Sequence, residues 1–151
     1  MAGFKGQFEY SVDNKGRVAI PAKLRAVLSP EARDTFVATR GIERCIYLYP
    51  LDYWEGEMEK RLRELNPYNH EARNYRRALL RWAEEVTLDK QGRIKLPKRL
   101  MEFAGIKDEA ILIGSMELIE VWGPEYFNQY VNDEVYPFEV LNERVMGGTL
   151  R

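Results

Sequence analysis

Alternating apolar and polar positions near the start of the chain predict a pair of short β-strands. Apolar side chains recur at every second position between Phe8 and Val12, which is the period of a strand with one buried face. The polar residues 13–16 end this pattern, and Asp, Asn and Gly there favour a tight turn. Residues 17–20 resume an apolar pattern, so the sequence predicts a β-hairpin over residues 8–20.

A short helix and a second hairpin are predicted next. Pro21 opens the helix, because proline is well tolerated in a first helical turn, and Ser29-Pro30 ends it. Strands follow at residues 36–39 and 45–49, separated by a turn. These elements make one unit in the order hairpin, helix, hairpin, with a further helix starting near residue 51.

The same unit occurs a second time in the chain. Residues 13–25 read DNKGRVAIPAKLR and residues 89–100 read DKQGRIKLPKRL, so equivalent positions are 76 residues apart. The second copy has predicted strands at 85–88, 93–96, 110–114 and 117–122, and a helix that begins at Pro97 and ends before Gly105. An internal repeat of this kind predicts two copies of one structural unit.

A helical segment separates the two copies. One helix is predicted over residues 51–65, and the polar residues 66–69 break it, with Asn69 as the N-cap of the next helix. The second helix carries an apolar stripe of Ala72, Tyr75, Leu79 and Trp82 and a basic stripe of Arg73, Arg77 and Arg81. A solvated face is the conservative explanation of the arginines, and contact with DNA or with a neighbouring subunit stays open.

Each unit is too small to fold alone. A unit of roughly 45 residues with four short strands buries too little apolar surface, and its hairpins leave open strand edges. Two units in one chain remove both problems if they interleave into a closed β-barrel. The sequence thus predicts an α+β fold of duplicated units, with flanking helices and two equivalent Asp-x-x-x-Arg turns in symmetric positions.

Charge is distributed unevenly along the chain. The 151 residues include 23 Lys and Arg and 24 Asp and Glu, for a net charge of −1. Residues 1–44 hold eight basic and five acidic residues, whereas residues 102–151 hold three and ten. The basic part suits an anionic partner, although an ordinary dipolar surface explains the same counts and is favoured on charge alone.

Scarce residue types exclude several classes of site. Cys45 is the only cysteine and His70 the only histidine, which excludes an intrachain disulfide and a His/Cys zinc site and favours a reducing compartment. Cys45 is expected in a strand core, and His70 is expected to be exposed near a helix start. No apolar run reaches the ~20 residues of a membrane span. Neither a Ser/His/Asp set nor a phosphate-binding glycine loop is present, so no enzyme activity is predicted.

Three features together resemble the MraZ family of bacterial transcriptional regulators. They are the doubled Asp-x-x-x-Arg pattern with proline four residues further on, the extended first strand over residues 6–17, and the pair of helices between the copies. The resemblance extends to about residue 132. It implies two domains like those of the AbrB regulators in a swapped-hairpin β-barrel. It also implies a ring-shaped homo-oligomer that binds direct repeats in promoter DNA upstream of the division and cell-wall gene cluster, with repression as the expected outcome.

The resemblance also divides the chain and restricts its partners. It places a first AbrB-like DNA-binding domain at residues 7–54, a helical insert at 55–82, a second AbrB-like DNA-binding domain at 83–127 and an acidic C-terminal tail at 128–151. The implied partners are double-stranded promoter DNA and further copies of the chain, in the cytoplasm and associated with the nucleoid. No cofactor, metal, small-molecule substrate or membrane is expected.

The hairpin turns are the expected DNA-binding elements. By the resemblance, DNA contact is assigned to Lys15, Arg17 and Arg93, with Asn14 and Lys90 as lesser candidates. Arginine suits this role because its guanidinium can bind guanine O6 and N7 or a phosphate, and lysine supplies a point charge to phosphate. The second turn has glutamine at the position of Lys15, so the two turns are not chemically equivalent.

A structural role for these turns stands beside DNA contact. Arg17 can pair with Asp13, and Arg93 with Asp89, so that each ion pair fixes its turn. The residues expected to stabilise the turns are Asp13, Gly16, Asp89 and Gly92, with the glycines at backbone positions that need positive φ. The two roles are compatible, because the aspartate can hold the arginine in a conformation that is ready to bind.

Other functions also fit a duplicated barrel. An AbrB-like antitoxin or protein-interaction ring is the main alternative, although such proteins usually carry one copy per chain and a disordered partner-binding tail. A purely structural ring is the other, and it predicts no salt-dependent DNA binding. In a regulator, linked copies supply the affinity that a single turn lacks, so a monomeric variant is expected to lose operator binding.

Overall fold

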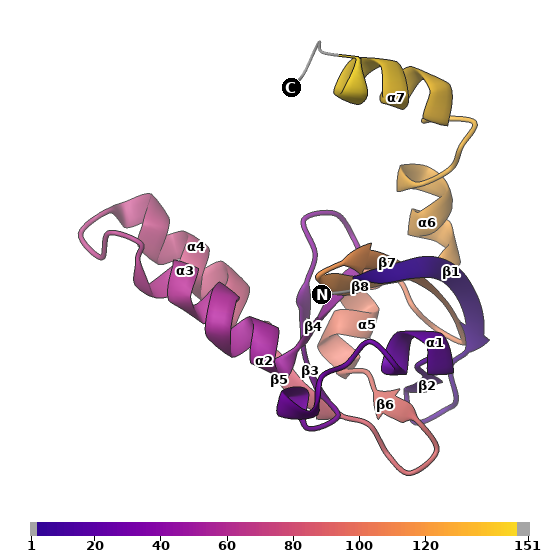
Figure 1. Ribbon diagram of the computed structural model, residues 1–151, viewed down its shortest axis with the longest axis horizontal. Coiled ribbons are helices and arrows are strands. Elements are labelled where there is room, and N and C mark those ends of the chain that lie inside the picture. Colours follow the sequence, from indigo (N-terminus) through magenta and orange to yellow (C-terminus); the bar gives the residue numbers. More distant parts are fainter. Residues whose placement is uncertain (1–2, 148–151) are drawn as a thin grey trace.

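Short strands and helices alternate along the chain (Figure 1). The computed structural model describes residues 3–147. Its strands are β1 (Phe4–Ser11), β2 (Arg17–Ala19), β3 (Thr35–Arg40), β4 (Ile46–Pro50), β5 (Glu84–Thr87), β6 (Arg93–Lys95), β7 (Glu109–Met116) and β8 (Leu118–Trp122). Its helices are α1 (Ala22–Arg25), α2 (Leu51–Tyr53), α3 (Glu59–Arg63), α4 (His70–Leu80), α5 (Lys98–Ala104), α6 (Pro124–Tyr130) and α7 (Phe138–Met146), with a 3₁₀ turn, η1 (Pro30–Ala32), and a π-helical turn, η2 (Trp54–Met58).

The strands form two antiparallel sheets, and both sheets mix the two repeats. A six-stranded sheet has the order β1-β7-β8-β4-β3-β5, and β2 pairs with β6 in a two-stranded ribbon. β1 of the first repeat pairs along its whole length with β7 of the second, and β5 of the second pairs with β3 of the first. The predicted α+β class and the interleaving of duplicated units are therefore confirmed.

The predicted hairpin over residues 8–20 is wrong. β1 and β2 both exist as strands, but β1 pairs with β7 and β2 pairs with β6. Length is the physical reason, because the eight residues of β1 match the eight of β7, whereas β2 has only three. The turn at residues 13–16 therefore carries the chain from one sheet to the other.

An approximate two-fold axis relates the repeats. In the β2–β6 ribbon, Val18 lies opposite Ile94, which is its own counterpart in the other repeat. On either side of this pair, the backbone N–H of Ile20 donates to the Gly92 carbonyl and that of Leu96 donates to the Gly16 carbonyl, both at 2.9 Å. These symmetric bonds bring the two predicted turns together, and the ribbon lies at the end of the molecule opposite α7 (Figure 1).

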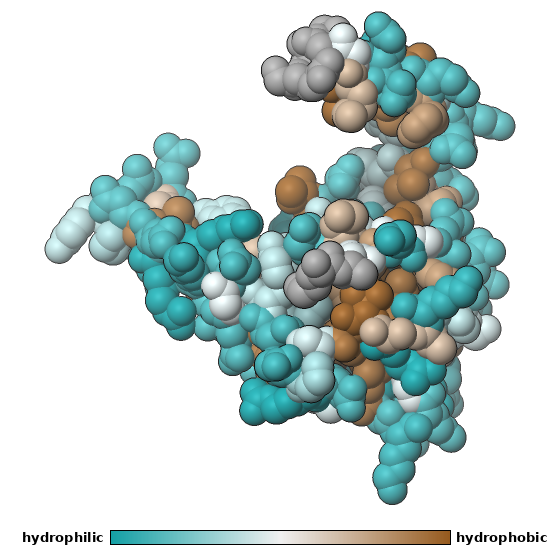
Figure 2. Space-filling model, viewed as in Figure 1, coloured by the Kyte–Doolittle hydropathy of each residue, from teal (hydrophilic) through white to brown (hydrophobic). Residues whose placement is uncertain are grey.

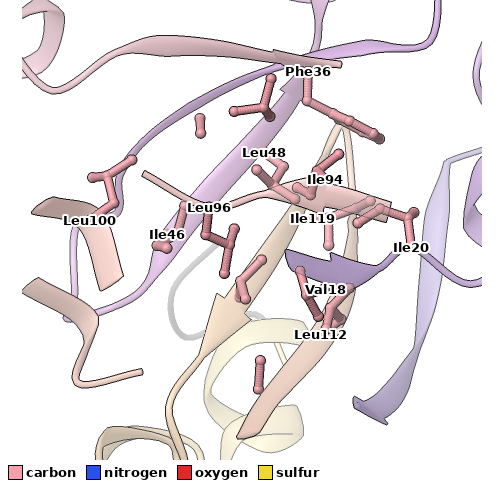
Figure 3. Close-up of a cluster of buried hydrophobic side chains, with 14 of the residues drawn as sticks. Val18, Ile20, Phe36, Ile46, Leu48, Ile94, Leu96, Leu100, Leu112 and Ile119 are labelled. Atoms are coloured by element: carbon pink, nitrogen blue, oxygen red, sulfur yellow. The ribbon is translucent and has the colours of Figure 1, made fainter. Parts of the chain in front are cut away.

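The main hydrophobic core belongs to both repeats. Its buried side chains include, from the first repeat, Val18, Ile20, Leu24, Phe36, Ile46 and Leu48 and, from the second, Ile94, Leu96, Leu100, Leu112, Ile119 and Val121. Figure 3 shows the core side chains of the ribbon converging with those of the larger sheet and of α5. The exchanged strands thus pack the two repeats into one cluster.

A helical arm leaves this body between the repeats (Figure 1). The helix predicted over residues 51–65 is present as α2, η2 and α3 in succession, with the π turn as the departure from the prediction. Asn69 caps α4 as predicted, because its Oδ1 accepts a hydrogen bond from the backbone N–H of Ala72 at 3.0 Å. Leu79 of the predicted apolar stripe packs against a buried cluster, but Tyr75 is 55% exposed.

The predicted acidic tail contains a helix. α6 begins before this tail and packs on the body through Tyr126, Phe127 and Tyr130. α7 follows within the tail, so the weak periodicity beyond Asn132 conceals a helix at Phe138–Met146. Every residue of α7 is exposed. Residues 148–151 of the predicted tail lie outside the described residues.

Cys45 and His70 lie where the sequence predicts. Cys45 is fully buried next to β4, and burial raises the pKa of its thiol. His70 is exposed at the start of α4. Within residues 3–147, no helix has the length and apolar character needed to cross a bilayer, and no group of three His, Cys, Asp or Glu side chains is placed to hold a metal ion.

Candidate nucleic-acid interface

The first turn is built around the carboxylate of Asp13. Its Oδ1 accepts hydrogen bonds from the backbone N–H groups of Lys15 and Arg17, both at 2.9 Å, and its Oδ2 accepts one from Arg17 Nε at 2.7 Å. The backbone N–H of Gly16 donates to the Asp13 carbonyl at 3.0 Å. One aspartate thus closes the turn and orients the arginine.

The second turn repeats this geometry. Asp89 Oδ1 accepts hydrogen bonds from the backbone N–H groups of Gln91 and Arg93, both at 2.9 Å, and its Oδ2 accepts one from Arg93 Nε at 3.1 Å. Gly16 and Gly92 have φ angles of +79° and +74°, in the left-handed region that glycine enters without strain. The four residues predicted to stabilise the turns lie at these bonds and backbone positions.

The two turns are close enough to interact. Arg93 Nη1 lies 3.8 Å from Asp13 Oδ2, so the arginine of the second turn faces the carboxylates of both turns. Across the ribbon, Arg17 lies opposite Lys95, and Ala19 lies opposite Arg93. The turns therefore form one surface.

The ribbon directs its charged side chains away from the core. Val18 and Ile94 are 0% and 1% exposed, so the alternation of a strand turns Arg17, Arg93 and Lys95 toward the other face. Lys95 is exposed and was not predicted as a site residue. Its relation to Arg17 depends on the pairing of β2 with β6, which no local motif reveals.

The tips of the turns add further polar side chains to this surface. Asn14, Lys15 and Lys90 are all exposed, as is Gln91. All five predicted DNA-contacting residues therefore belong to the two neighbouring turns and their ribbon, although they lie far apart in the sequence.

A further cation reaches the second turn from the first repeat. Arg25 Nε donates to the Ile20 carbonyl at 2.9 Å. Its guanidinium covers Gly92, with Cζ 2.9 Å from the position that a Cβ would occupy if Gly92 had a side chain. Met101 occupies the equivalent place over the first turn, with its Sδ 3.2 Å from the place of a Cβ on Gly16. Comparison of the two repeats could have identified Arg25 as a candidate, because the equivalent position in the second repeat is the uncharged Met101.

Basic groups outnumber acidic groups on this surface. Its cations are Lys15, Arg17, Arg25, Lys90, Arg93 and Lys95, and both turn carboxylates are paired with arginine. Arg17 bonds Asp13 through Nε, and its Nη1 and Nη2 have no hydrogen-bond partner within residues 3–147. These two nitrogens leave the arginine with donors for an external acceptor.

Hydrogen bonds keep both turn carboxylates charged. The backbone N–H of Arg17, aided by its guanidinium, lowers the pKa of Asp13 to about 2 against the opposing effect of burial. The backbone N–H of Arg93 likewise lowers the pKa of Asp89. Both carboxylates are therefore ionised at neutral pH, and each keeps its hydrogen bonds to the neighbouring arginine.

The low pKa of Asp13 predicts an acid-dependent loss of stability. A carboxyl whose pKa is lower in the folded chain stabilises the fold above its unfolded pKa, and this contribution disappears as pH falls through the folded value. The stability difference between wild type and Asp13→Asn is therefore expected to be full near pH 6 and to vanish between pH 3.8 and about 2. Urea unfolding at a series of pH values measures it, with Asp133→Asn in the tail as a control that keeps the wild-type profile.

The chain is similar to known proteins over nearly its whole length. A family model described as "MraZ protein, putative antitoxin-like" matches residues 4–78 and again residues 79–147. A protein of Natranaerobius thermophilus named "Transcriptional regulator MraZ" is 38% identical over 143 residues, which cover 95% of this chain and 96% of the relative. Proteins of the same name from Clostridium acetobutylicum and Thermoanaerobacter pseudethanolicus are each 39% identical, over 87% and 93% of this chain and 89% and 94% of their own lengths.

Proposed function

The chain belongs to the MraZ family, and from this premise we propose that it is a sequence-specific DNA-binding regulator of transcription. The observation that carries the proposal is the pair of two-fold-related turns that present arginines from one ribbon. Relatives named as transcriptional regulators support the same assignment. The function has no catalytic step, and no cofactor is required.

The shape and chemistry of the ribbon suit the major groove of DNA. That groove is about 12 Å wide and admits a two-stranded β-ribbon. In the proposed complex Arg17 and Arg93 contact guanine edges or phosphates, and Lys15, Lys90 and Asn14 contact the DNA backbone beside them. Arg25 and Lys95 add positive charge to the same approach.

Repetition supplies the rest of the proposed mechanism. We propose that the exchanged strands close into a swapped-hairpin β-barrel and that copies of the chain form a ring. A ring presents many ribbons to direct repeats in a promoter, so that weak contacts combine into a stable complex. The proposed promoter lies upstream of the division and cell-wall gene cluster, and occupation of it represses transcription in the cytoplasm, at the nucleoid.

The proposed domain boundaries follow the same scheme. The DNA-binding units cover residues 7–54 and 83–127, a helical insert covers 55–82, and an acidic tail covers 128–151. Both sheets contain strands of both units, so the units form one folded body. The proposed boundaries therefore divide the chain by function and do not separate independently folded domains.

Fluorescence anisotropy with a duplex from the region upstream of the protein's own gene tests the function. Wild type is expected to prefer this duplex over a scrambled one and to bind more weakly as salt rises. Arg17→Ala is expected to weaken binding about 5- to 150-fold, since a good arginine–base contact is worth ~1–3 kcal/mol. Arg93→Ala is expected to weaken binding as well. Part of its effect is structural, because Arg93 also faces the carboxylate of Asp13 in the other turn.

A matched variant separates contact from charge. Arg61→Ala removes the same charge from an exposed position on α3, away from the ribbon, and is expected to keep wild-type affinity. If the duplex is not preferred, or if all three variants bind alike, the ribbon arginines have a structural role only. The alternative function, an AbrB-like antitoxin or protein-interaction ring, then takes precedence, in line with the wording of the family description.

A further inference from the structure

One face of α4 is basic. It forms a wall of a shallow groove whose lining residues are Pro67, Arg73, Arg76, Arg77, Leu80 and Arg81. Arg73, Arg77 and Arg81 are four positions apart, so they follow one another along one side of the helix at intervals of ~6 Å. Figure 2 shows hydrophilic side chains over most of the helical arm that contains α4.

The positive charge of this groove is not neutralised within residues 3–147. No carboxylate there lies within ion-pair distance of its arginines. Glu71, the acid in the first turn of α4, is two positions before Arg73 and therefore lies on the other side of the helix. Arg73 donates to the Pro67 carbonyl at 2.9 Å, and Arg77 donates to the Asn74 side chain at 3.1 Å. Both acceptors are neutral, so the groove keeps its charge.

Aromatic stacking connects this groove with the body. Arg81 Cζ lies 5.5 Å from the centroid of the Trp82 ring, and Cζ of Arg99 in α5 lies 4.0 Å from the same centroid. Arg99 Nη1 also donates to the Arg81 carbonyl at 3.1 Å. A guanidinium held on an aromatic ring is oriented without being paired to a carboxylate, so its outer N–H groups stay available to an anion.

A second open groove continues from Arg99 to the ribbon. Lys95, Lys98 and Arg99 line it, between β5 and the start of α5. Lys95 is itself a residue of the ribbon. Glu84 and Glu85 of β5 line the same groove, which is therefore only weakly positive before the arginines of α4 follow. Together, the arginines of the first groove, Arg99 and the lysines of the second groove form a basic track.

We propose that this basic track binds the phosphate backbone of double-stranded DNA beside the sequence that the ribbon reads. Successive phosphates of one strand advance ~3.4 Å along the duplex, so every second phosphate recurs at about the interval of the arginines on α4. Such contacts carry no sequence information, but they add affinity and fix the position of the protein on the duplex. The inference rests on the proposed function, because it extends a DNA contact that begins at the ribbon.

Two observations favour duplex DNA as the occupant of the track. The first is continuity, because a duplex held at the ribbon is a stiff rod that extends beyond it, and the track begins at Lys95 in that ribbon. The second is the scarcity of apolar surface. Leu80, 42% exposed, is the one large aliphatic side chain lining the α4 groove, which is too little to pack against another protein.

Fluorescence anisotropy over a salt series tests the track, with the duplex from upstream of the gene and its scrambled counterpart. Arg77→Gln/Arg81→Gln removes two charges and keeps polar side chains. It is expected to weaken binding to both duplexes by the same factor and to lower the slope of log affinity against log salt by about 2, or ~1 per phosphate contact. The preference for the upstream duplex is expected to keep its wild-type value, whereas Arg17→Ala reduces that preference.

Two further double variants serve as controls. Lys60→Gln/Arg61→Gln removes two exposed charges from α3 in the same arm, outside both grooves, and is expected to keep the wild-type affinity and slope. Arg77→Lys/Arg81→Lys restores the point charges that phosphate needs and is expected to restore the slope. Light scattering without DNA is expected to give the wild-type mass for every variant.

Several results would overturn the basic track while leaving the ribbon as proposed. They are a wild-type affinity and slope in Arg77→Gln/Arg81→Gln, a loss confined to the upstream duplex, a lysine variant that fails to restore the slope, and a changed mass without DNA, which would make this face a contact between copies. Equal binding of the two duplexes by wild type contradicts the proposed function alone, because the track is judged from the salt slope. A wild type that binds neither duplex overturns both.

Discussion

Replacing Ile94 by alanine is expected to lower the free energy of unfolding by about 2–5 kcal/mol, the usual cost of an Ile→Ala change in a packed core. Ile94 is 1% exposed and lies opposite Val18 at the two-fold axis, where residues of both repeats surround it. Because one core serves both repeats, the loss is expected to act on the whole chain. Urea unfolding followed by tryptophan fluorescence and by circular dichroism is expected to give one shared, shifted transition.

An exposed isoleucine provides the matched control. Ile42 is 87% exposed in the loop between β3 and β4, so Ile42→Ala is expected to change stability by no more than about 0.5 kcal/mol. Equal effects of the two variants would contradict the packing described for the ribbon. Two separate transitions would show that the repeats unfold independently, against the strand exchange.

Local pattern predicts the strands well and their partners poorly. Alternation marks β1 as a strand because Phe8 faces inward while its neighbours face solvent, and this depends only on nearby residues. The partner of Phe8 is Leu112, more than one hundred positions away in the sequence. Nothing in the pattern of residues 8–20 distinguishes that partner from β2, so the strand exchange could be anticipated only from the edges that a duplicated unit leaves open.

In the helical segments, too, local pattern predicts some features and misses others. Asn69 predicts the start of α4 because an N-cap bond is local. α7 escapes prediction because its apolar residues bury nothing within the chain and acidic residues alternate with them.

At the candidate interface, sequence identifies what each turn supplies for itself. The pairing of Arg17 with Asp13 and of Arg93 with Asp89, predicted from their spacing, is confirmed by the Nε–Oδ2 hydrogen bonds. Arg25 and Lys95 were missed because they reach the surface through pairing between repeats. Whether these residues bind DNA stays a prediction.

Asp13→Ala is expected to weaken DNA binding at least as much as Arg17→Ala, by about tenfold or more. The carboxylate accepts bonds from the Arg17 backbone and side chain and also closes the first turn, so its loss frees Arg17 and the turn that carries it. Arg93 loses its 3.8 Å contact with Asp13 but stays bonded to Asp89. The freed turn and its arginine must then be ordered on binding, which costs conformational entropy. Anisotropy with the same duplex, at one fixed salt concentration, measures the change.

The sign of this effect separates positioning from charge. If Asp13 acted only through its charge, removing it would make the surface more positive and would tighten binding to DNA phosphates. Asp108→Ala supplies that comparison, since it removes an exposed carboxylate close to the first turn, where the Asp108 carbonyl accepts the Val12 N–H at 2.8 Å, without removing a partner of either arginine. Weaker binding by Asp13→Ala together with equal or tighter binding by Asp108→Ala would mean that the turn works by holding its arginines in place. Tighter binding by both would mean that the aspartate serves the fold alone and that the ribbon attracts DNA only through its net positive charge.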